Sequence, residues 1–226
     1  MQVQKPPLQP GEPAPAFTLP AANREGMFSL ADWRGRAFLI GFYRGLHCPF
    51  CRRQVVQLGS LQPALRDAGV DLLAVINTPL ERARVYFRHR PTPVLLLSDP
   101  DCATHQAFGV PHVEFVPEDA SAKAAWPHTA TMAQFMAARH NPTGELPAAL
   151  HPMEANAVLN AKDGFEMQEA DNAILATHGT QLAGHFLVDR DGMVRWTQIE
   201  APGGPNELGT MPSAAQILAA VGRLAR

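Results

Sequence analysis

The chain has few cysteines, and their number excludes one class of protein. Three Cys occur in 226 residues, too few to form the disulfide scaffold of a small secreted domain. Two of them form the pair Cys48-Pro49-Phe50-Cys51. In a reducing compartment, this spacing indicates redox or metal chemistry rather than a structural staple.

Long apolar runs and an excess of charge are also missing. No stretch approaches the roughly 20 apolar residues of a membrane-spanning helix, and residues 1–15 contain no run that could act as a signal peptide. The formal net charge is −2, which gives no reason to expect nucleic acid as a partner. We therefore expect a cytoplasmic protein that binds neither nucleic acid nor a membrane.

What is present is a pattern of buried strands alternating with helices, which predicts an α/β fold with parallel strand pairing and helices on both faces of a sheet. Helices are expected over 52–68, where Pro63 should kink or divide the helix, over about 80–89 and over 213–224. An Asp-Gly turn predicts a late hairpin. The expected strands are 37–43, 71–76, 94–98, 185–189 and 193–198, with a small hairpin over 17–29.

Residues 111–180 interrupt this alternation. They show no clear strand and two or three helical regions, near 131–139, 154–159 and 169–178. Because seventy residues are too many for a simple loop, we expect a helical insert, or lid, within a single domain 1–226. Its apolar side chains must pack on something, so it is expected to narrow access to Cys48 or to form part of a homodimer interface.

The cysteine pair follows a buried strand and opens a helix. Backbone N–H groups and the helix dipole stabilise a thiolate at that position, and the neighbouring Arg44, Arg52 and Arg53 are expected to add positive potential. Cys48 is therefore the expected nucleophile. A peroxide would oxidise it to a sulfenic acid, with which Cys51 would condense to a disulfide.

Other interpretations of the pair remain open. One alternative is a zinc site, because the residue types and spacing would suit four ligands: Cys48, Cys51, Cys102 and His105. The other alternative is an inert, buried cysteine pair. A c-type haem is excluded in practice because Arg52 stands where that motif needs His. We expect no metal and no cofactor, with Cys102 serving as ordinary packing and His185 as a core histidine that could face the pair.

Five segments carry a resemblance to a known family. They are 11–19 (GEPAPAFTL), 30–36 (LADWRGR), 42–54 (FYRGLHCPFCRRQ), 98–101 (SDPD) and 186–192 (FLVDRDG). Together they resemble landmarks of the alkyl hydroperoxide reductase / thiol-specific antioxidant (AhpC/TSA, peroxiredoxin) family, and 42–54 is similar to its subgroup with a Cys-x-x-Cys. The resemblance lies within residues 11–110 and 181–200.

The resemblance implies a thioredoxin-like fold and an antioxidant thiol peroxidase, with Cys48 as the peroxidatic residue and Cys51 as the resolving one. It implies a peroxide or disulfide substrate and a thiol reductant such as thioredoxin or glutathione. The sequence departs from the family pattern at several positions: Gly41 replaces its Pro, and Gly45 replaces the Thr whose hydroxyl orients the peroxide. The family's Arg near the late strand is also absent, because residues 181–184 (QLAG) precede that strand. Arg44 is expected to supply charge at the site. The alternatives are a thioredoxin-like protein disulfide reductase and a zinc-stabilised or redox-sensing binding module.

Overall fold

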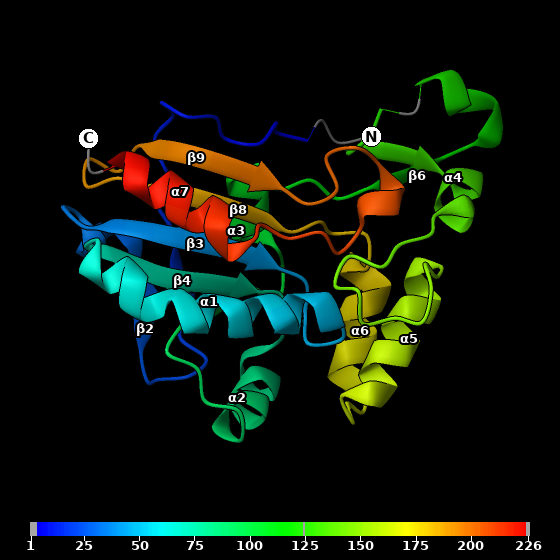
Figure 1. Cartoon of the computed structure of the whole chain (residues 1–226). Coiled ribbons are helices and arrows are strands. Elements are labelled where there is room, and N and C mark those ends of the chain that lie inside the picture. The colour runs from blue at the N-terminus through cyan, green and yellow to red at the C-terminus, as the bar shows by residue number, and fades with distance from the viewer. Residues whose placement is uncertain (1–3, 124, 225–226) are drawn as a thin grey trace.

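A five-stranded mixed sheet forms the centre of the computed structural model, which describes residues 4–123 and 125–224. The strand order is β5-β4-β3-β8-β9 (Figure 1). The three strands β3 (Ala37–Tyr43), β4 (Val70–Ile76) and β5 (Leu95–Ser98) are parallel. The late hairpin, β8 (Gly184–Val188) and β9 (Val194–Ile199), joins β3 in antiparallel orientation. The expected mixed sheet is thus confirmed.

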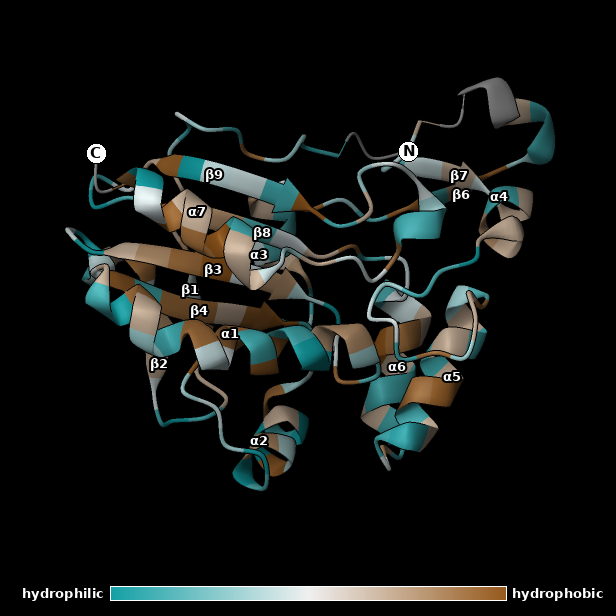
Figure 2. Cartoon of the chain, viewed as in Figure 1, coloured by the Kyte–Doolittle hydropathy of each residue, from teal (hydrophilic) through white to brown (hydrophobic). Residues whose placement is uncertain are grey.

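On each face of the sheet, strand side chains and the elements packed on them form a separate hydrophobic cluster. On one face pack α1 (Pro49–Asp67), α2 (Leu80–Arg88) and α7 (Ala214–Leu224). On the other lie the short α3 (Ala103–Ala107), the hairpin β1 (Thr18–Pro20) and β2 (Met27–Ser29), and the 3-10 helix η1 (Leu30–Trp33). Figure 2 shows β3 and β4 as predominantly hydrophobic, because these central strands are covered from both sides.

Helix α1 continues through Pro63 instead of dividing there. Pro63 is exposed, so its ring lies on the solvent side of the helix, and a helix can bend at a proline without ending there. The expected division of the helix is therefore wrong, although its position after β3 is confirmed.

Segment 111–180 contains the three expected helices, α4 (Met132–Ala137), α5 (Pro152–Lys162) and α6 (Glu169–His178). It also contains two strands, β6 (Glu114–Val116) and β7 (Thr129–Thr131), which pair in parallel. The expectation of no strand is therefore wrong: three residues are too few for a hydrophobic period to show. Two further 3-10 helices are η2 (Glu118–Lys123), in this segment, and η3 (Pro205–Glu207).

Helices α5 and α6 lie beside the N-terminal end of α1, where the cysteine pair is located (Figure 1). The buried side chains of Leu146, Ala155 and Leu159 belong to the same hydrophobic cluster as α1. The segment is therefore packed on the end of the core that carries the cysteine pair. Across residues 4–123 and 125–224, no helix is both long enough and apolar enough to cross a membrane.

Candidate active site

Cys48 is the N-cap residue of α1. The chain leaves β3 at Tyr43, turns, and enters the helix at Pro49. The Cys48 sulfur accepts a hydrogen bond from the backbone N–H of Cys51 at 3.2 Å, which is one of the unpaired donors of the first helical turn. Both cysteines are buried and neither forms a disulfide. The sequence therefore places the Cys48 sulfur, the predicted nucleophile, at the anion-stabilising end of a helix.

Arg44 is the nearest charge to this sulfur. Its Nε donates to the Cys48 sulfur at 3.5 Å, and its two terminal nitrogens form a bidentate pair with Glu200 at 2.8 and 2.7 Å. Glu200 is buried and also accepts from the backbone N–H groups of Ala183 and Gly209. Because Glu200 holds the two terminal nitrogens of the Arg44 guanidinium, the Nε remains directed at the Cys48 sulfur.

The two thiols have opposite proton affinities. Burial raises the pKa of Cys48, but a hydrogen bond from the Cys51 side chain and the charge of Arg44 outweigh it and lower this pKa from 9.0 to about 6. Burial, the hydrogen bond with Cys48 and the charge on Cys48 all raise the pKa of Cys51 well above 9.0. At neutral pH Cys48 is therefore a thiolate and Cys51 a thiol.

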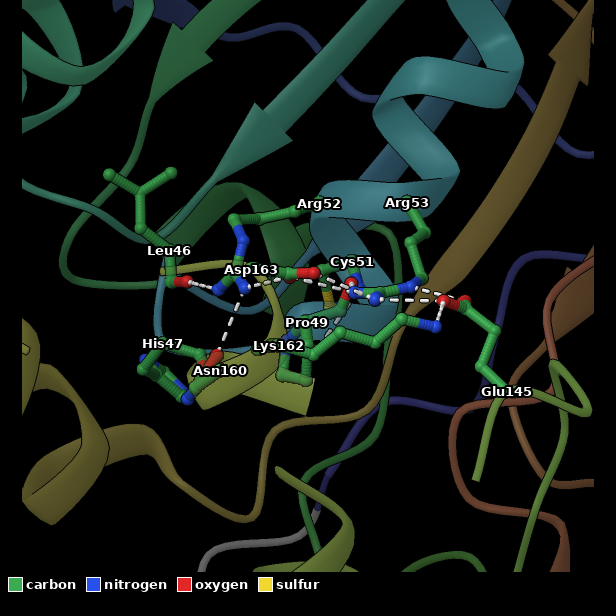
Figure 3. A network of polar contacts seen from close by, with 11 residues as sticks. Leu46, His47, Pro49, Cys51, Arg52, Arg53, Glu145, Asn160, Lys162 and Asp163 are labelled. Atoms are coloured by element: carbon green, nitrogen blue, oxygen red, sulfur yellow. Dashed lines mark hydrogen bonds and ion pairs between the residues drawn. The ribbon is translucent and has the colours of Figure 1, made fainter. Parts of the chain in front are cut away.

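Arg52 and Arg53 have a different role from the one expected. Arg52 donates to Asp163 at 2.5 Å, and Arg53 forms ion pairs with both Asp163 and Glu145. These carboxylates come from segment 111–180, and Lys162 joins the network through Glu145 (Figure 3). The expected contribution of Arg52 and Arg53 to the potential at Cys48 is thus corrected: their charges are matched by carboxylates, and they clamp the segment to α1.

The four ligands of the zinc interpretation do not come together. His105 contacts Asp99 and the carbonyl of Tyr43, and Cys102 accepts only a long contact, 3.6 Å, from Asn77. Within the described part of the chain, no three His, Cys, Asp or Glu side chains lie close enough to hold a metal ion. Burial raises the pKa of Cys102 to about 12, as in a cysteine that only packs.

Sequence reasoning missed Glu200, noted His47 only as the neighbour of Cys48, and expected His185 to be a core histidine. Glu200 directly follows β9 and is buried, which is unusual for an acidic side chain and does not show in the sequence. His185 is fully buried and forms a 2.7 Å hydrogen bond with the hydroxyl of Tyr43, whose pKa is raised by burial and by the charge of Cys51. His185 is therefore a core histidine whose hydrogen-bond partner is Tyr43 rather than either cysteine of the pair.

A cavity of about 280 Å³ lies against the residues that surround Cys48. Arg44, His47 and Phe50 line it from the core, while most of its remaining wall comes from segment 111–180. The wall is largely apolar, with a few polar groups beside the thiolate, which is the usual character of a small-molecule site. The apolar lining from the segment includes Val113, Phe115, Trp126, Phe135, Met153 and Leu175.

Comparisons with known proteins agree with this geometry. The model of the AhpC/TSA family matches residues 10–197. Peroxiredoxin Bcp of Escherichia coli (strain K12) is 33% identical over 104 residues, which are 46% of this chain and 66% of that protein. The chain thus spans slightly less than two thirds of the length of the curated relatives that it first matches.

Solved structures show a similar fold. Reduced 2-Cys peroxiredoxin of Plasmodium vivax has a TM-score of 0.57 and 16% identity, covering 97% of this chain and 83% of that one. AhpC of Mycobacterium bovis has a TM-score of 0.56 and 13% identity, covering 98% and 94%. These similarities confirm the expected thioredoxin-like α/β fold.

Proposed function

The chain belongs to the AhpC/TSA family, and from this membership and the Cys48 site we propose that it is a thiol-dependent peroxidase with an antioxidant role. The observation that carries the proposal is the sulfur of Cys48, held as a thiolate by the Cys51 N–H and by Arg44. The Escherichia coli relative is named a peroxiredoxin. A stabilised thiolate beside a cavity is what attack on a peroxide requires.

The proposed cycle has three steps. The Cys48 thiolate attacks one peroxide oxygen, so that the S–O bond forms, the O–O bond breaks and an alkoxide or hydroxide leaves. The sulfur of Cys51 then attacks the sulfenic sulfur and releases water, leaving a Cys48–Cys51 disulfide. A thiol reductant such as thioredoxin or glutathione returns both thiols by exchange.

The coupling between the two thiols favours this order of events. The negative charge on Cys48 is one cause of the raised pKa of Cys51. When Cys48 becomes a neutral sulfenic acid, that charge disappears, and Cys51 loses its proton more easily. Cys51 thus stays protonated during the attack on peroxide and becomes nucleophilic after it.

The proposal extends to the whole chain. We take residues 1–226 as one thioredoxin-like domain and 111–180 as an insert that covers the active end. The exposed side chains of Met132, Met136 and Phe115 on this insert support a homodimer interface, because exposed apolar patches mark association surfaces. Three free cysteines suit a reducing compartment, so we place the activity in the cytoplasm.

A peroxide-consumption assay tests the activity. Reduced protein is mixed with cumene hydroperoxide or hydrogen peroxide and recycled by thioredoxin with its reductase, or by glutathione. We expect turnover in the native chain, none in Cys48→Ser, and a single oxidation without recycling by thioredoxin in Cys51→Ser. A native chain that reduces peroxide no faster than an equal concentration of free cysteine would refute the proposal.

A second function, reduction of protein disulfides, is favoured by one observation. Gly45 has no hydroxyl to orient a peroxide, whereas disulfide exchange needs no such group. Reduction of insulin disulfides by the dithiol form, compared with peroxide reduction under the same conditions, separates the two functions.

A further inference from the structure

Position 45, where the family pattern has a hydroxyl side chain, is closely surrounded by the side chains of its neighbours. A Cβ atom at Gly45 would lie 2.9 Å from Oδ1 of Asn77, 3.1 Å from Nδ1 of His47 and 3.1 Å from Oγ1 of Thr78. These distances are tighter than ordinary contacts, so a larger residue would displace its neighbours. The turn before Cys48 is therefore built around a glycine, with the imidazole of His47 beside it.

His47 is buried, and neither ring nitrogen has a hydrogen-bond partner among the residues that the structure describes. Buried polar groups are almost always paired, so two free nitrogens on one ring need an explanation. The backbone carbonyl of His47 accepts a hydrogen bond from Asn160 at 3.2 Å, and the two residues lie side by side in Figure 3. The residue is thus held in place while its ring remains unpaired.

His47 lines the same cavity as Arg44, the residue whose Nε contacts the Cys48 sulfur. Burial and the charge of Arg44 lower the pKa of His47 to about 4, so the ring is neutral at physiological pH. A neutral imidazole offers one N–H donor and one acceptor nitrogen. A hydroperoxide group has one O–H donor and several acceptor lone pairs, which matches this pair of sites.

We propose that His47 is a catalytic residue that hydrogen-bonds the peroxide group of the substrate beside Cys48, in place of the hydroxyl that position 45 lacks. The inference rests on the proposed peroxidase function. The acceptor nitrogen takes the hydrogen bond from the hydroperoxide O–H and turns that oxygen toward the thiolate. Sulfur then bonds to this oxygen and is oxidised, the O–O bond breaks, and the departing alkoxide takes a proton from water.

Two rates measured on the reduced protein test the role. One is the second-order rate of Cys48 oxidation by cumene hydroperoxide, and the other is the rate of its alkylation by iodoacetamide. We expect His47→Leu to lower the oxidation rate about 10- to 100-fold, the effect of losing one transition-state hydrogen bond. Alkylation should change by less than about 2-fold, because it depends on the thiolate and not on a peroxide contact.

Matched variants complete the test. His47→Gln keeps a donor and an acceptor and should restore much of the oxidation rate. His47→Met is an unbranched apolar replacement that can be measured if the Leu variant does not fold. Glu154→Gln changes an exposed polar side chain of the same helix as part of the cavity wall, α5, but outside the cavity lining, and should leave both rates unchanged.

The outcomes separate the two proposals. Equal losses of oxidation and alkylation in His47→Leu would show a structural role and overturn the inference. Unchanged oxidation in His47→Leu, with a fast native rate, would overturn it as well while leaving the peroxidase function intact. A native chain that oxidises no faster than free cysteine would overturn the peroxidase function and this inference with it.

Discussion

Two groups stabilise the Cys48 sulfur: one is local in the sequence, and the other is positioned by a residue far along the chain. The N–H of Cys51 is local and follows from the start of a helix. The charge of Arg44 is held by Glu200, which lies 156 residues further along the chain. The reactivity of one atom thus depends on a helix terminus and on a tertiary ion pair.

The first prediction concerns the pH dependence of Cys48 alkylation. Because the thiolate is the reactive form and the pKa of Cys48 is lowered to about 6, the iodoacetamide rate should rise as the pH increases through about 6. It should level off above about pH 7. Cys102, whose pKa is raised to about 12, should remain unlabelled over this range. Mass-mapped labelling measures both, and equal rates at Cys48 and Cys102 would contradict the assignment.

A second prediction concerns Glu200, whose negative charge raises the pKa of Cys48. Glu200→Gln should therefore lower the Cys48 pKa below about 6 and increase alkylation on the acidic side of the profile. Leaving the buried Arg44 without its counterion should also reduce the free energy of unfolding, by about 3 kcal/mol. The alkylation profile and urea unfolding measure the two effects. Glu154→Gln, at an exposed position of α5, should change neither, and a raised Cys48 pKa in Glu200→Gln would contradict the account.

Among the elements, the sheet and the long helices could be predicted from the sequence. The apolar run Ala37–Tyr43 is the whole of β3, because a strand covered on both faces reads as continuous hydrophobicity. The short β6 and β7 were missed, since three residues carry no period. The partners of Arg52 and Arg53 were missed as well, because nothing in the sequence shows which distant carboxylate will pair with an arginine.

The third prediction tests the clamp between α1 and segment 111–180. Asp163→Ala removes the carboxylate shared by Arg52 and Arg53. Since the pairs are partly exposed and screened, the free energy of unfolding should fall by about 1–2 kcal/mol. The Cys48 alkylation rate at a given pH should stay the same, because Arg44 provides the stabilising charge.

Urea unfolding and labelling together decide this third prediction. Glu81→Ala breaks the exposed Arg84–Glu81 pair and serves as the control, with an expected change within about 0.5 kcal/mol. A large change in the Cys48 alkylation rate in Asp163→Ala would show that Arg52 and Arg53 act on the thiolate after all.

At the scale of the whole molecule, segment 111–180 builds most of the cavity wall beside Cys48. The core alone supplies the thiolate and its ion pair, whereas the segment supplies the apolar surroundings. Access to the sulfur, and the choice between small and bulky peroxides, should therefore depend on the segment rather than on the sheet.

The fourth prediction is that deleting about residues 115–175, with a short linker, changes this access. The deletion should increase the Cys48 alkylation rate and reduce any preference for cumene hydroperoxide over hydrogen peroxide. Size-exclusion chromatography would show whether the oligomeric state changes too. If the deletion variant does not fold, Ala130→Phe, which fills the cavity, should lower the rate with cumene hydroperoxide more than with hydrogen peroxide. A folded deletion variant with an unchanged oligomeric state and labelling rate would show that the segment has neither role.

The central claim, that Cys48 and Cys51 form one redox unit that reduces a peroxide, is tested most directly by titrating the reduced protein with hydrogen peroxide and mapping its cysteines by mass spectrometry. The account predicts that one equivalent of peroxide converts both thiols into a Cys48–Cys51 disulfide while Cys102 stays reduced. Oxidation of Cys102 before the pair, or a Cys48 that remains reduced, would contradict it.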